Sequence, residues 1–349
     1  MGGEAHQTNQ LTNQLTNQLT EPLIGVVVPT LNGHWRMGNT LRCIAAQTIG
    51  PVELIVVDDG SSVPINVESV RRHLGQWAVA GAAVRVLRNP SPVGVAMARN
   101  LGLAAVTARW VAFCDDDDLW APGKLAAQLQ ALAEGGAWAI SSAVGVFEDL
   151  TPYTNFEVVP RSTQQWIADL FEFNSVPGGG SGVLVRTSLL RELGGFDATS
   201  NQFADWDLNL RLALHDGAPS CAPGAVIAKV HHPARMTARL DELAAELDLM
   251  HQRWQRERER TGLGTSEYRY RGVRWLAAQA CQAGPRTLPM IWRLPASRRN
   301  RLMWSLRTFV DPSARQRALR YRLRTTAARR QRAAAALKSI RAVLEQDGR

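Results

Sequence analysis

The feature that most constrains this chain is a run of four aspartates, residues 115–118, which follows directly on a short apolar stretch, residues 110–114. The apolar stretch indicates a buried strand, and four adjacent carboxylates cannot be buried without a counter-charge. They must therefore lie at the end of that strand, in water or around a cation. One interpretation is a divalent metal ion that holds the phosphates of a nucleotide. The other is a solvated acidic turn before a helix that begins near Pro122.

Three further runs that are rich in apolar residues come before the aspartates, and each is followed by a polar loop. They alternate with helical patterns, which predicts βαβ units with right-handed crossovers. The predicted strands are 23–28, 52–57 and 83–87, and the predicted helices are 39–48, 67–80 and 96–105. The loops after the first two strands contain Thr30, Asn32, Asp58 and Asp59. Because the carboxyl ends of parallel strands share one edge of a sheet, these side chains should converge with the aspartate run, which favours the metal interpretation.

Composition and charge indicate a globular body with a basic end. The chain has 349 residues, of which 45% are hydrophobic, and four scattered cysteines. No apolar run approaches the roughly 20 residues of a bilayer span, and no signal-peptide pattern is found, so we expect a cytoplasmic protein. Residues 1–20 repeat a polar motif and are predicted to be disordered. Residues 286–349 hold 17 Lys and Arg against 3 Asp and Glu, which leaves the preceding residues mildly acidic.

Five short motifs stand in a fixed order along the first part of the chain. They are residues 26–32 (VVVPTLN), 47–48 (QT), 53–61 (ELIVVDDGS), 94–100 (GVAMARN) and 113–120 (FCDDDDLW). In this order and spacing they resemble family 2 glycosyltransferases, and the resemblance extends over roughly residues 23–235. It implies the GT-A fold, a Rossmann-type α/β architecture with a mostly parallel sheet flanked by helices. It also implies a nucleotide-sugar donor and inversion at the anomeric carbon.

The resemblance implies which residues contact the donor. Those residues are Pro29, Thr30, Asn32, Asp59, Gly94 and Arg99. The first three would line the nucleoside pocket, and Asp59 would accept a hydrogen bond from the base, which for uracil comes from the ring N3–H. Leu31 stands where the family commonly has an aromatic residue, so stacking on the base would be weaker here.

The aspartate run resembles the DxD motif of the family. Asp117 would bind Mg²⁺ or Mn²⁺ directly, and Asp115 and Asp116 would be shared between the metal, its water and the ribose hydroxyls. The run of four also permits a match shifted by one residue. Further along, the His-Pro pair in residues 228–237 (AKVHHPARMT) would make His232 another metal ligand or a contact to the diphosphate. A surface histidine without such a role is the alternative.

The second half of the resemblance implies the catalytic base. Residues 181–197 (SGVLVRTSLLRELGGFD) look like the strand, helix and GGFD turn of the family, and residues 203–211 (FADWDLNLR) like its acidic motif. Ala204 replaces the usual Glu, and Asp205 keeps the position of the base, where a carboxylate accepts the proton of a sugar hydroxyl. Asp207 is expected to pair with Arg211 instead.

Two other features lie beside this motif. Trp206, together with Trp166 and Phe203, would either stack on a sugar or pack in the core. The glycine-rich residues 177–182 (PGGGSG) lack the signature of a phosphate loop, and we expect a flexible loop near the acceptor.

The last third of the chain is predicted to be helical. Apolar residues recur at intervals of three and four from Leu240 to Trp254, which predicts a helix that docks on the catalytic domain or forms the seam of a homodimer. Residues 286–349 interleave arginines with aromatic and aliphatic residues. This pattern favours an anionic membrane surface as partner, with a solvated helical bundle as the alternative and nucleic acid as the least favoured.

These inferences divide the chain into a disordered tail (1–20), a nucleotide-sugar-binding half (21–120), an acceptor-binding half (121–237) and a helical basic region (238–349). We expect a metal-dependent inverting glycosyltransferase, located in the cytoplasm and peripheral on the inner face of the membrane. A UDP-sugar is the favoured donor, and a hydroxyl of a glycan, lipid-linked glycan, natural product or peptide is the acceptor. Two other classes stay open: a catalytically silent nucleotide- or membrane-binding module, and a nucleotidyltransferase, which would release pyrophosphate.

Overall fold

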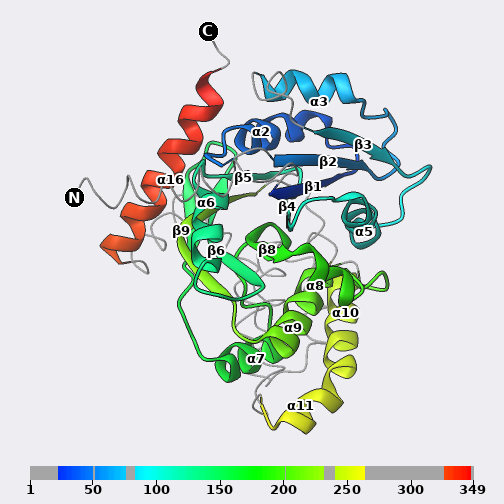
Figure 1. Cartoon of the computed structure of the whole chain (residues 1–349), viewed down its shortest axis with the longest axis vertical. Helices are drawn as coiled ribbons and strands as arrows, with labels where there is room; N and C mark the ends of the chain where they lie inside the picture. Colours follow the sequence, from blue (N-terminus) through cyan, green and yellow to red (C-terminus); the bar gives the residue numbers. More distant parts are fainter. Residues whose placement is uncertain are drawn as a thin grey trace, which may run out of the picture.

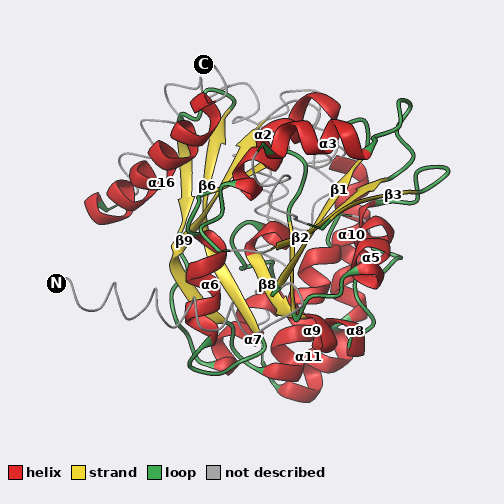
Figure 2. Ribbon diagram, turned by 45° about the horizontal axis from the view of Figure 1, so that its top comes forward, coloured by secondary structure: helices red, strands yellow, loops and turns green. Residues whose placement is uncertain are grey.

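The computed structural model of the chain describes residues 23–49, 52–75, 83–200, 202–231, 240–263 and 326–346. Within these ranges the chain forms one sheet of nine strands, with helices on both of its faces (Figures 1 and 2). The strand order is β3-β2-β1-β4-β8-β6-β9-β5, and β7 pairs with β6 outside this path. The predicted tail, His232 and most of the region 286–349 lie outside the described residues.

The first half of the sheet is parallel, as predicted. Its strands β1, β2 and β4 are mainly apolar and are buried on both faces, the pattern typical of parallel sheets, whereas the edge strand β3 carries two arginines and is only half-buried. The elements are β1 (Ile24–Thr30), α2 (His34–Ala45), β2 (Val52–Asp58), α3 (Val67–Leu74), β3 (Val84–Arg88), α5 (Val95–Ala105) and β4 (Trp110–Phe113). The helix α2 begins five residues earlier than expected, because the backbone carbonyl of Gly33 already accepts hydrogen bonds from Arg36 and Met37.

The second half of the sheet is mixed. The strand β8 runs antiparallel to β4 and β6, β9 runs parallel to β6, and β5 runs antiparallel to β9. The strands are β5 (Asp118–Trp120), β6 (Trp138–Phe147), β7 (Pro152–Phe156), β8 (Val183–Arg186) and β9 (Ser220–His231). The helices are α6 (Lys124–Leu132), α7 (Thr163–Glu172), the short η1 (Gly179–Gly182), α8 (Thr187–Glu192), α9 (Ala204–Asp216), α10 (Leu240–Arg253), α11 (Gln255–Thr261) and α16 (Ala327–Glu345). The predicted α/β architecture with a mostly parallel sheet is confirmed.

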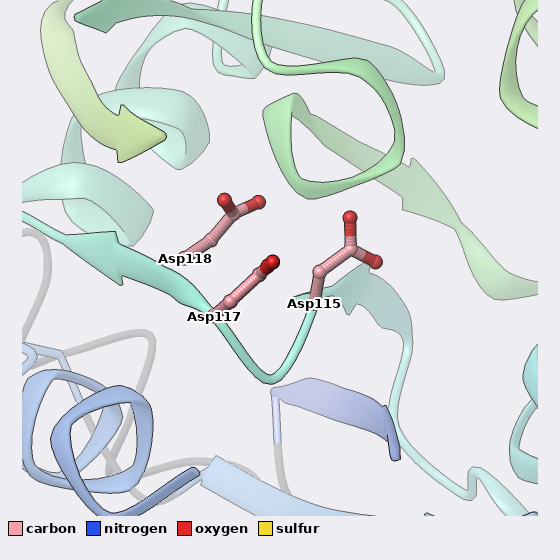
Figure 3. A group of neighbouring side chains, drawn as sticks. All are labelled: Asp115, Asp117 and Asp118. Atoms are coloured by element: carbon pink, nitrogen blue, oxygen red, sulfur yellow. The ribbon is translucent and has the colours of Figure 1, made fainter. Parts of the chain in front are cut away.

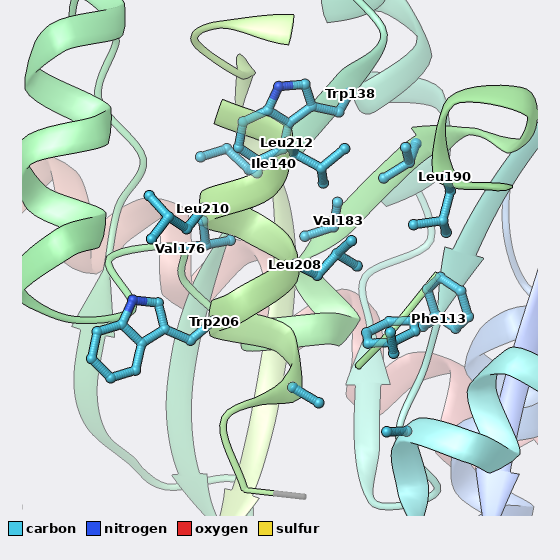
Figure 4. Close-up of a cluster of buried hydrophobic side chains, with 14 of the residues drawn as sticks. Phe113, Trp138, Ile140, Val176, Val183, Leu190, Trp206, Leu208, Leu210 and Leu212 are labelled. Atoms are coloured by element: carbon cyan, nitrogen blue, oxygen red, sulfur yellow. The ribbon is translucent and has the colours of Figure 1, made fainter. Parts of the chain in front are cut away.

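Two apolar clusters hold the helices against the sheet. In β1 the side chain of Val27 belongs to one cluster, and those of Val26 and Val28 belong to the other. The first cluster joins the sheet to α5, α7, α9 and α10, and Figure 4 shows a part of it around α9. The second joins the sheet to α2, α3, α6 and α16. Alternate side chains of one strand thus anchor opposite layers of the molecule.

The described part of the basic C-terminal region is the helix α16, which lies beside β6 and β9 in Figure 1. Its face of Ala333, Ala336, Leu337 and Ile340 is buried in the second cluster. On the flank of this face Arg329 and Arg332 pair with Glu157. This helix is therefore packed on the catalytic domain, while membrane contact of the region 286–349 stays a prediction. Among the described helices none is long and apolar enough to cross a bilayer.

Candidate active site

The polar ends of the parallel strands meet at one edge of the sheet, as the sequence predicts. Thr30 ends β1 and lies opposite Asp58, the last residue of β2, in the strand register. The aspartate run begins two residues after β4, which pairs with β1 on its other side. A hydrogen bond of 2.6 Å from Thr30 Oγ1 to Asp116 Oδ2 joins two of these strand ends directly.

The side chains of the aspartate run point in two directions. Those of Asp115, Asp117 and Asp118 form one group, and that of Asp116 points elsewhere. The carboxylates of Asp115, Asp117 and Asp118 each place an oxygen within 4.8 Å of the other two, and they rise on the same side of the turn in Figure 3. The carboxylate of Asp116 faces Thr30 instead. Asp118 is the first residue of β5, and the Thr40 hydroxyl lies 3.0 Å from the backbone carbonyls of both Asp116 and Asp118. The turn that presents the three carboxylates is thereby fixed to α2.

Asp116 occupies an unfavourable place for a charge. Burial raises its pKa to about 6, and the neighbouring charge of Asp117 acts in the same direction. The hydrogen bond from Thr30 and the guanidinium of Arg36, whose Nη2 lies 3.6 Å from Asp116 Oδ2, oppose the rise only in part. A carboxyl with a pKa near 6 takes up a proton more readily than an exposed aspartate, and when protonated it can both donate and accept hydrogen bonds.

Two cations neutralise the other carboxylates. Arg99, from α5, places its Nη2 atom 2.5 Å from Asp115 Oδ1. Lys229, from β9, places its Nζ atom 2.6 Å from Asp118 Oδ2 and 3.4 Å from Asp115 Oδ2. These charges hold the pKa of Asp115 well below its usual range, although burial acts in the opposite direction. The counter-charge that four adjacent carboxylates require is thus supplied by the chain itself. The position of Lys229 in the sequence does not by itself predict this role.

Asn32, one of the residues predicted to line the nucleoside pocket, ties two loops at this edge together. Its backbone adopts a left-handed conformation with φ of 54°. Its side-chain oxygen accepts hydrogen bonds from the backbone nitrogen and the hydroxyl of Ser62, both over 2.9 Å, and its backbone nitrogen donates to Ser61 Oγ. The loop after β1 is therefore locked to the loop after β2. Pro29 is buried inside β1.

The two aspartates after β2 have different surroundings. Asp58 is fully buried, accepts from the backbone nitrogens of Ser61 and Ile65, and pairs with Arg88. Asp59 accepts three hydrogen bonds, from the Asn89 amide and from the backbone nitrogens of Val93 and Gly94. Gly94 precedes α5, so Asp59 positions the helix that carries Arg99. A carboxylate offers about four acceptor positions, which leaves room for one further donor such as the ring N–H of a base.

Asp205 lies in the first turn of α9, and its charge interacts with those of Arg99 and Asp115. Its Oδ2 atom accepts a hydrogen bond of 3.2 Å from the backbone nitrogen of Gly180, and its Oδ1 atom lies 2.8 Å from the backbone nitrogen of Trp206. Burial raises the pKa of Asp205, and the charge of Asp115 adds to the rise, while Arg99 and Lys229 oppose it. A carboxylate with a raised pKa is a stronger base than an exposed one, as proton abstraction from a hydroxyl requires.

The glycine-rich loop lies against both Asp205 and Arg99. A Cβ atom at Gly179, whose φ is +55°, would come within 2.1 Å of Asp205 Oδ2. A Cβ atom at Gly180 would lie 3.2 Å from the Arg99 guanidinium. Ser181, in the same loop, accepts a hydrogen bond of 3.0 Å from the backbone nitrogen of Asp115. The sequence analysis placed this loop near the acceptor, and the structure brings it into contact with the residue predicted to be the base.

The structure corrects the placement of Trp206 at the substrate. Trp206 is 1% exposed, and its Nε1 atom donates to the backbone carbonyl of Leu170 over 2.5 Å. Trp166 and Phe203 are also buried. The apolar residues of α9 that follow Trp206 draw its ring into the first cluster (Figure 4), so core packing takes precedence over sugar stacking.

The neighbouring Asp207 pairs with Arg211, as predicted, with 2.8 Å between Oδ2 and Nε. It also lies within 3.3 Å of Arg253 Nη1 and 3.1 Å of Trp254 Nε1, which come from the end of α10 and the residue after it. The apolar face of α10 is buried in the first cluster, so the predicted docking of this helix on the catalytic domain is confirmed. A homodimer seam elsewhere stays a prediction.

His232 lies outside the described residues, but its neighbour His231 is the last residue of β9. The His231 ring meets the rings of Phe147 and Tyr153, with centroids 6.2 Å and 6.0 Å away. A histidine does therefore stand two residues after Lys229, on the same face of the strand. Its part in metal or diphosphate binding stays a prediction.

The chemistry of the carboxylate cluster fits a divalent ion. Mg²⁺ and Mn²⁺ prefer oxygen ligands and are commonly held by one or two carboxylates together with substrate phosphates. Asp115 and Asp117 are partly exposed beside the buried Asp118, so an ion and the phosphates that accompany it have access to the cluster. Asp117 with Asp115 is the pair best suited to hold such an ion.

Comparison with known proteins agrees with this geometry. Residues 25–194 match the sequence profile of Glycosyl transferase family 2. The chain therefore carries a family 2 glycosyltransferase domain. All the strands of the parallel half, the aspartate run and the glycine-rich loop belong to this domain, whereas Asp205 and Lys229 follow it in the sequence.

Curated relatives of the domain are bacterial glycosyltransferases. The Pre-mycofactocin glycosyltransferase of Mycobacterium tuberculosis is 30% identical over 212 residues, which are 60% of this chain and 43% of that protein. The Putative teichuronic acid biosynthesis glycosyltransferase TuaG of Bacillus subtilis is 30% identical over 143 residues, which are 41% of this chain and 55% of that protein. The chain thus spans about half the length of these relatives.

Among solved structures, S. aureus TarS 1–349 in complex with UDP-GlcNAc is similar with a TM-score of 0.49 and 15% sequence identity. The similarity covers 91% of this chain and 80% of that one. The fold of this chain is GT-A-like by its own strand order and by its family 2 domain.

Proposed function

We propose that this protein is a metal-dependent inverting glycosyltransferase that moves a sugar from a nucleoside-diphosphate sugar to a hydroxyl acceptor. The observation that carries the proposal is that Arg99 interacts with both carboxylate groups. It pairs with Asp115 of the aspartate cluster, and its charge also acts on Asp205. A candidate base and a candidate phosphate-metal site that share one fixed cation suit an in-line displacement at a sugar carbon.

Each group has a chemical task in this mechanism. Asp117 and Asp115 would hold a divalent ion, and when bound that ion would supply positive charge to the departing diphosphate. Asp205 accepts the proton of the acceptor hydroxyl while the oxygen of that hydroxyl attacks the anomeric carbon from the face opposite the diphosphate. The backbone nitrogen of Gly180 holds the carboxylate of Asp205 in one orientation, which reduces the entropy lost on reaching the transition state.

The donor and acceptor are proposed from the relatives and the sequence. One relative, WfgD of Escherichia coli, is named a UDP-Glc:alpha-D-GlcNAc-diphosphoundecaprenol beta-1,3-glucosyltransferase and is 29% identical over 107 residues. A UDP-sugar is therefore our proposed donor. For the acceptor we propose a lipid-linked glycan, with polysaccharide, natural product and peptide as alternatives. A lipid-linked acceptor agrees with the proposal that the basic region 286–349 contacts an anionic membrane.

Calorimetric titration of UDP, GDP and dTDP, with and without Mn²⁺, tests the donor site. We expect one nucleotide to bind in a metal-dependent manner to the wild type and to lose that binding in Asp117→Ala. Asp248→Ala, an exposed acidic residue of α10, is the matched control and should bind as the wild type does. Binding of no nucleotide would contradict the proposal. Release of pyrophosphate in place of a nucleoside diphosphate during turnover would favour a nucleotidyltransferase.

A further inference from the structure

Lys229 is built into the aspartate cluster by the pairing of two strands. In the antiparallel register of β5 and β9 it stands directly opposite Asp118, so the two side chains project on the same face of the sheet. Its ammonium lies 2.6 Å from Asp118 Oδ2 and 3.4 Å from Asp115 Oδ2. The Asp118 side chain is fully buried, whereas that of Lys229 is 20% exposed. The ammonium thus reaches the cluster from its solvent side.

The ammonium and a divalent ion would share a carboxylate. Asp115 is one of the two residues proposed to hold the ion, and its Oδ2 atom lies 3.4 Å from the ammonium. A Mg²⁺ or Mn²⁺ ion binds carboxylate oxygens at about 2.1 Å, so an ion on Asp115 Oδ2 would lie less than about 6 Å from the ammonium. Two cations at that distance in a partly buried site repel each other strongly. One of them must give way.

The two counter-cations of the cluster differ in how firmly they are held. Arg99 is 5% exposed, packs over the ring of Phe196 and is buried among Asp115, Asp205 and the glycine-rich loop. Lys229 carries a point charge on a flexible four-carbon stem that can move without disturbing the fold. Of the two, Lys229 is the cation that can leave its carboxylates.

We propose that Lys229 is an exchangeable counter-cation, which occupies Asp115 and Asp118 until a divalent ion enters and then moves to the diphosphate of the donor. The first half of this proposal concerns the ion alone; the second half rests on the proposed function. An ion that enters without a diphosphate would displace the ammonium from Asp115 and Asp118. With a diphosphate present the ammonium gains a new partner, so the nucleotide strengthens ion binding, and the ion strengthens nucleotide binding by the same factor.

Titration of Mn²⁺ alone, followed by the electron paramagnetic resonance signal of the free ion, tests the competition. Lys229→Met removes the competing charge, and we expect Mn²⁺ to bind about tenfold more tightly than to the wild type. The chain has three lysines, and Lys338, exposed on α16, offers a control with the same change in side chain and net charge. Lys338→Met should bind Mn²⁺ as the wild type does. Unchanged or weaker binding in Lys229→Met, or binding of Mn²⁺ to neither protein, would overturn the proposal.

Asp118 is buried, so loss of the Lys229 ammonium that pairs with it should lower the stability of the protein. A second variant therefore controls for misfolding. Lys229→Gln is neutral but can still donate a hydrogen bond to Asp118, and it should also bind Mn²⁺ more tightly than the wild type. Thermal melting gives a separate readout: Mn²⁺ should raise the Tm of either neutral variant by more than it raises that of the wild type. Equal shifts would contradict the competition.

A final titration of Mn²⁺ in the presence of UDP tests the second half. UDP should increase Mn²⁺ affinity in the wild type by a larger factor than in Lys229→Met. An equal factor in both proteins would overturn the movement to the diphosphate. Failure of UDP to bind at all would refute the proposed UDP-sugar donor and this second half, while the result with Mn²⁺ alone would still decide the competition.

Discussion

The Oδ2 atom of Asp205 lies 3.2 Å from the backbone nitrogen of Gly180, and the next glycine back, Gly179, presents no side chain toward it. The loop that holds the predicted base therefore approaches it so closely that only glycine fits at position 179. Asp205 and Gly180 come from segments 25 residues apart in the sequence. The orientation of the base therefore depends on the loop as much as on α9.

Gly179→Ala should displace the Asp205 carboxylate, because the added Cβ would lie 2.1 Å from its Oδ2 atom. We expect kcat to fall about 10²-fold, the effect of a misplacement of about 1 Å, with nucleotide affinity unchanged. Gly194→Ala is the control: Gly194 also has a positive φ, +78°, but nothing lies within 4 Å of its added Cβ. Equal losses in both variants would mean that backbone strain alone is responsible.

Asp205→Asn should abolish proton abstraction and leave the donor site intact. The amide can still accept the hydrogen bond from Gly180, so the loop keeps its place, but it cannot take a proton. We expect kcat to fall about 10²–10⁴-fold, while calorimetry shows unchanged UDP affinity in the presence of Mn²⁺. Loss of UDP binding together with activity would contradict the role of Asp205 as the base.

Removal of the Arg99 charge should shift the pH dependence of kcat. Asp205 acts when ionised, so kcat rises as the pH rises through its pKa, which burial raises and Arg99 lowers. Arg99→Met removes a charge that stabilises the carboxylate, and the acid limb should move to higher pH. Arg99→Lys keeps a positive charge and should leave the limb closer to that of the wild type. A shift to lower pH in Arg99→Met would refute the assignment.

Asp116→Asn should stabilise the protein at neutral pH in the presence of EDTA. Its folded pKa, about 6, lies above the ordinary value of 3.8, so the folded state binds the proton more tightly than the unfolded state. Stability therefore falls as the pH rises from about 4 to about 6 and stays lower above that range. At pH 7.5 the variant should gain about 2 to 3 kcal/mol, which urea unfolding measures, and at pH 3.5 nothing. Asp248→Asn, on the surface, should show no such gain, and an equal gain at both pH values would contradict the argument.

Ile340→Ala should destabilise the whole domain, because the Ile340 side chain is fully buried between α16 and the sheet. Large-to-small changes at such sites typically reduce the free energy of unfolding by about 2 to 5 kcal/mol. Lys338→Ala, on the exposed side of the same helix, should change it by less than about 0.5 kcal/mol. Equal stability of Ile340→Ala and the wild type would show that α16 does not dock in solution.

The sequence predicts the parallel half well, because its strands are rich in β-branched and other apolar residues and each is followed by a polar loop. The convergence of Thr30 with the aspartates follows from sheet geometry alone. The separate orientation of Asp116 could not be predicted in this way. Its side chain accepts a hydrogen bond from Thr30 and its backbone carbonyl accepts one from Thr40, and the spacing of residues in the sequence carries no information on these contacts. Four identical residues in a row give no pattern from which it could be read.

Lys229 and Trp206 could not be assigned for two further physical reasons. Lys229 meets Asp118 through strand pairing across 111 residues, and such a register is set by the whole sheet. Trp206 stands beside a candidate base in a motif that suits either a sugar or a core. Leu208, Leu210 and Leu212 follow it at every second position and so lie on different faces of the helix. This pattern was the available signal that α9 is buried on most of its faces.

The strand β9 has the aspartate cluster on one face and the C-terminal helix on the other. Lys229 points to Asp118, while Val226 and Ala228 belong to the apolar cluster that contains Ala333 and Ile340 of α16. Only the thickness of one strand separates α16 from the aspartate cluster. Removal of α16, or attachment of a bulky fusion to it, would therefore disturb the position of Lys229, and an assay on such a protein would report on an altered carboxylate cluster.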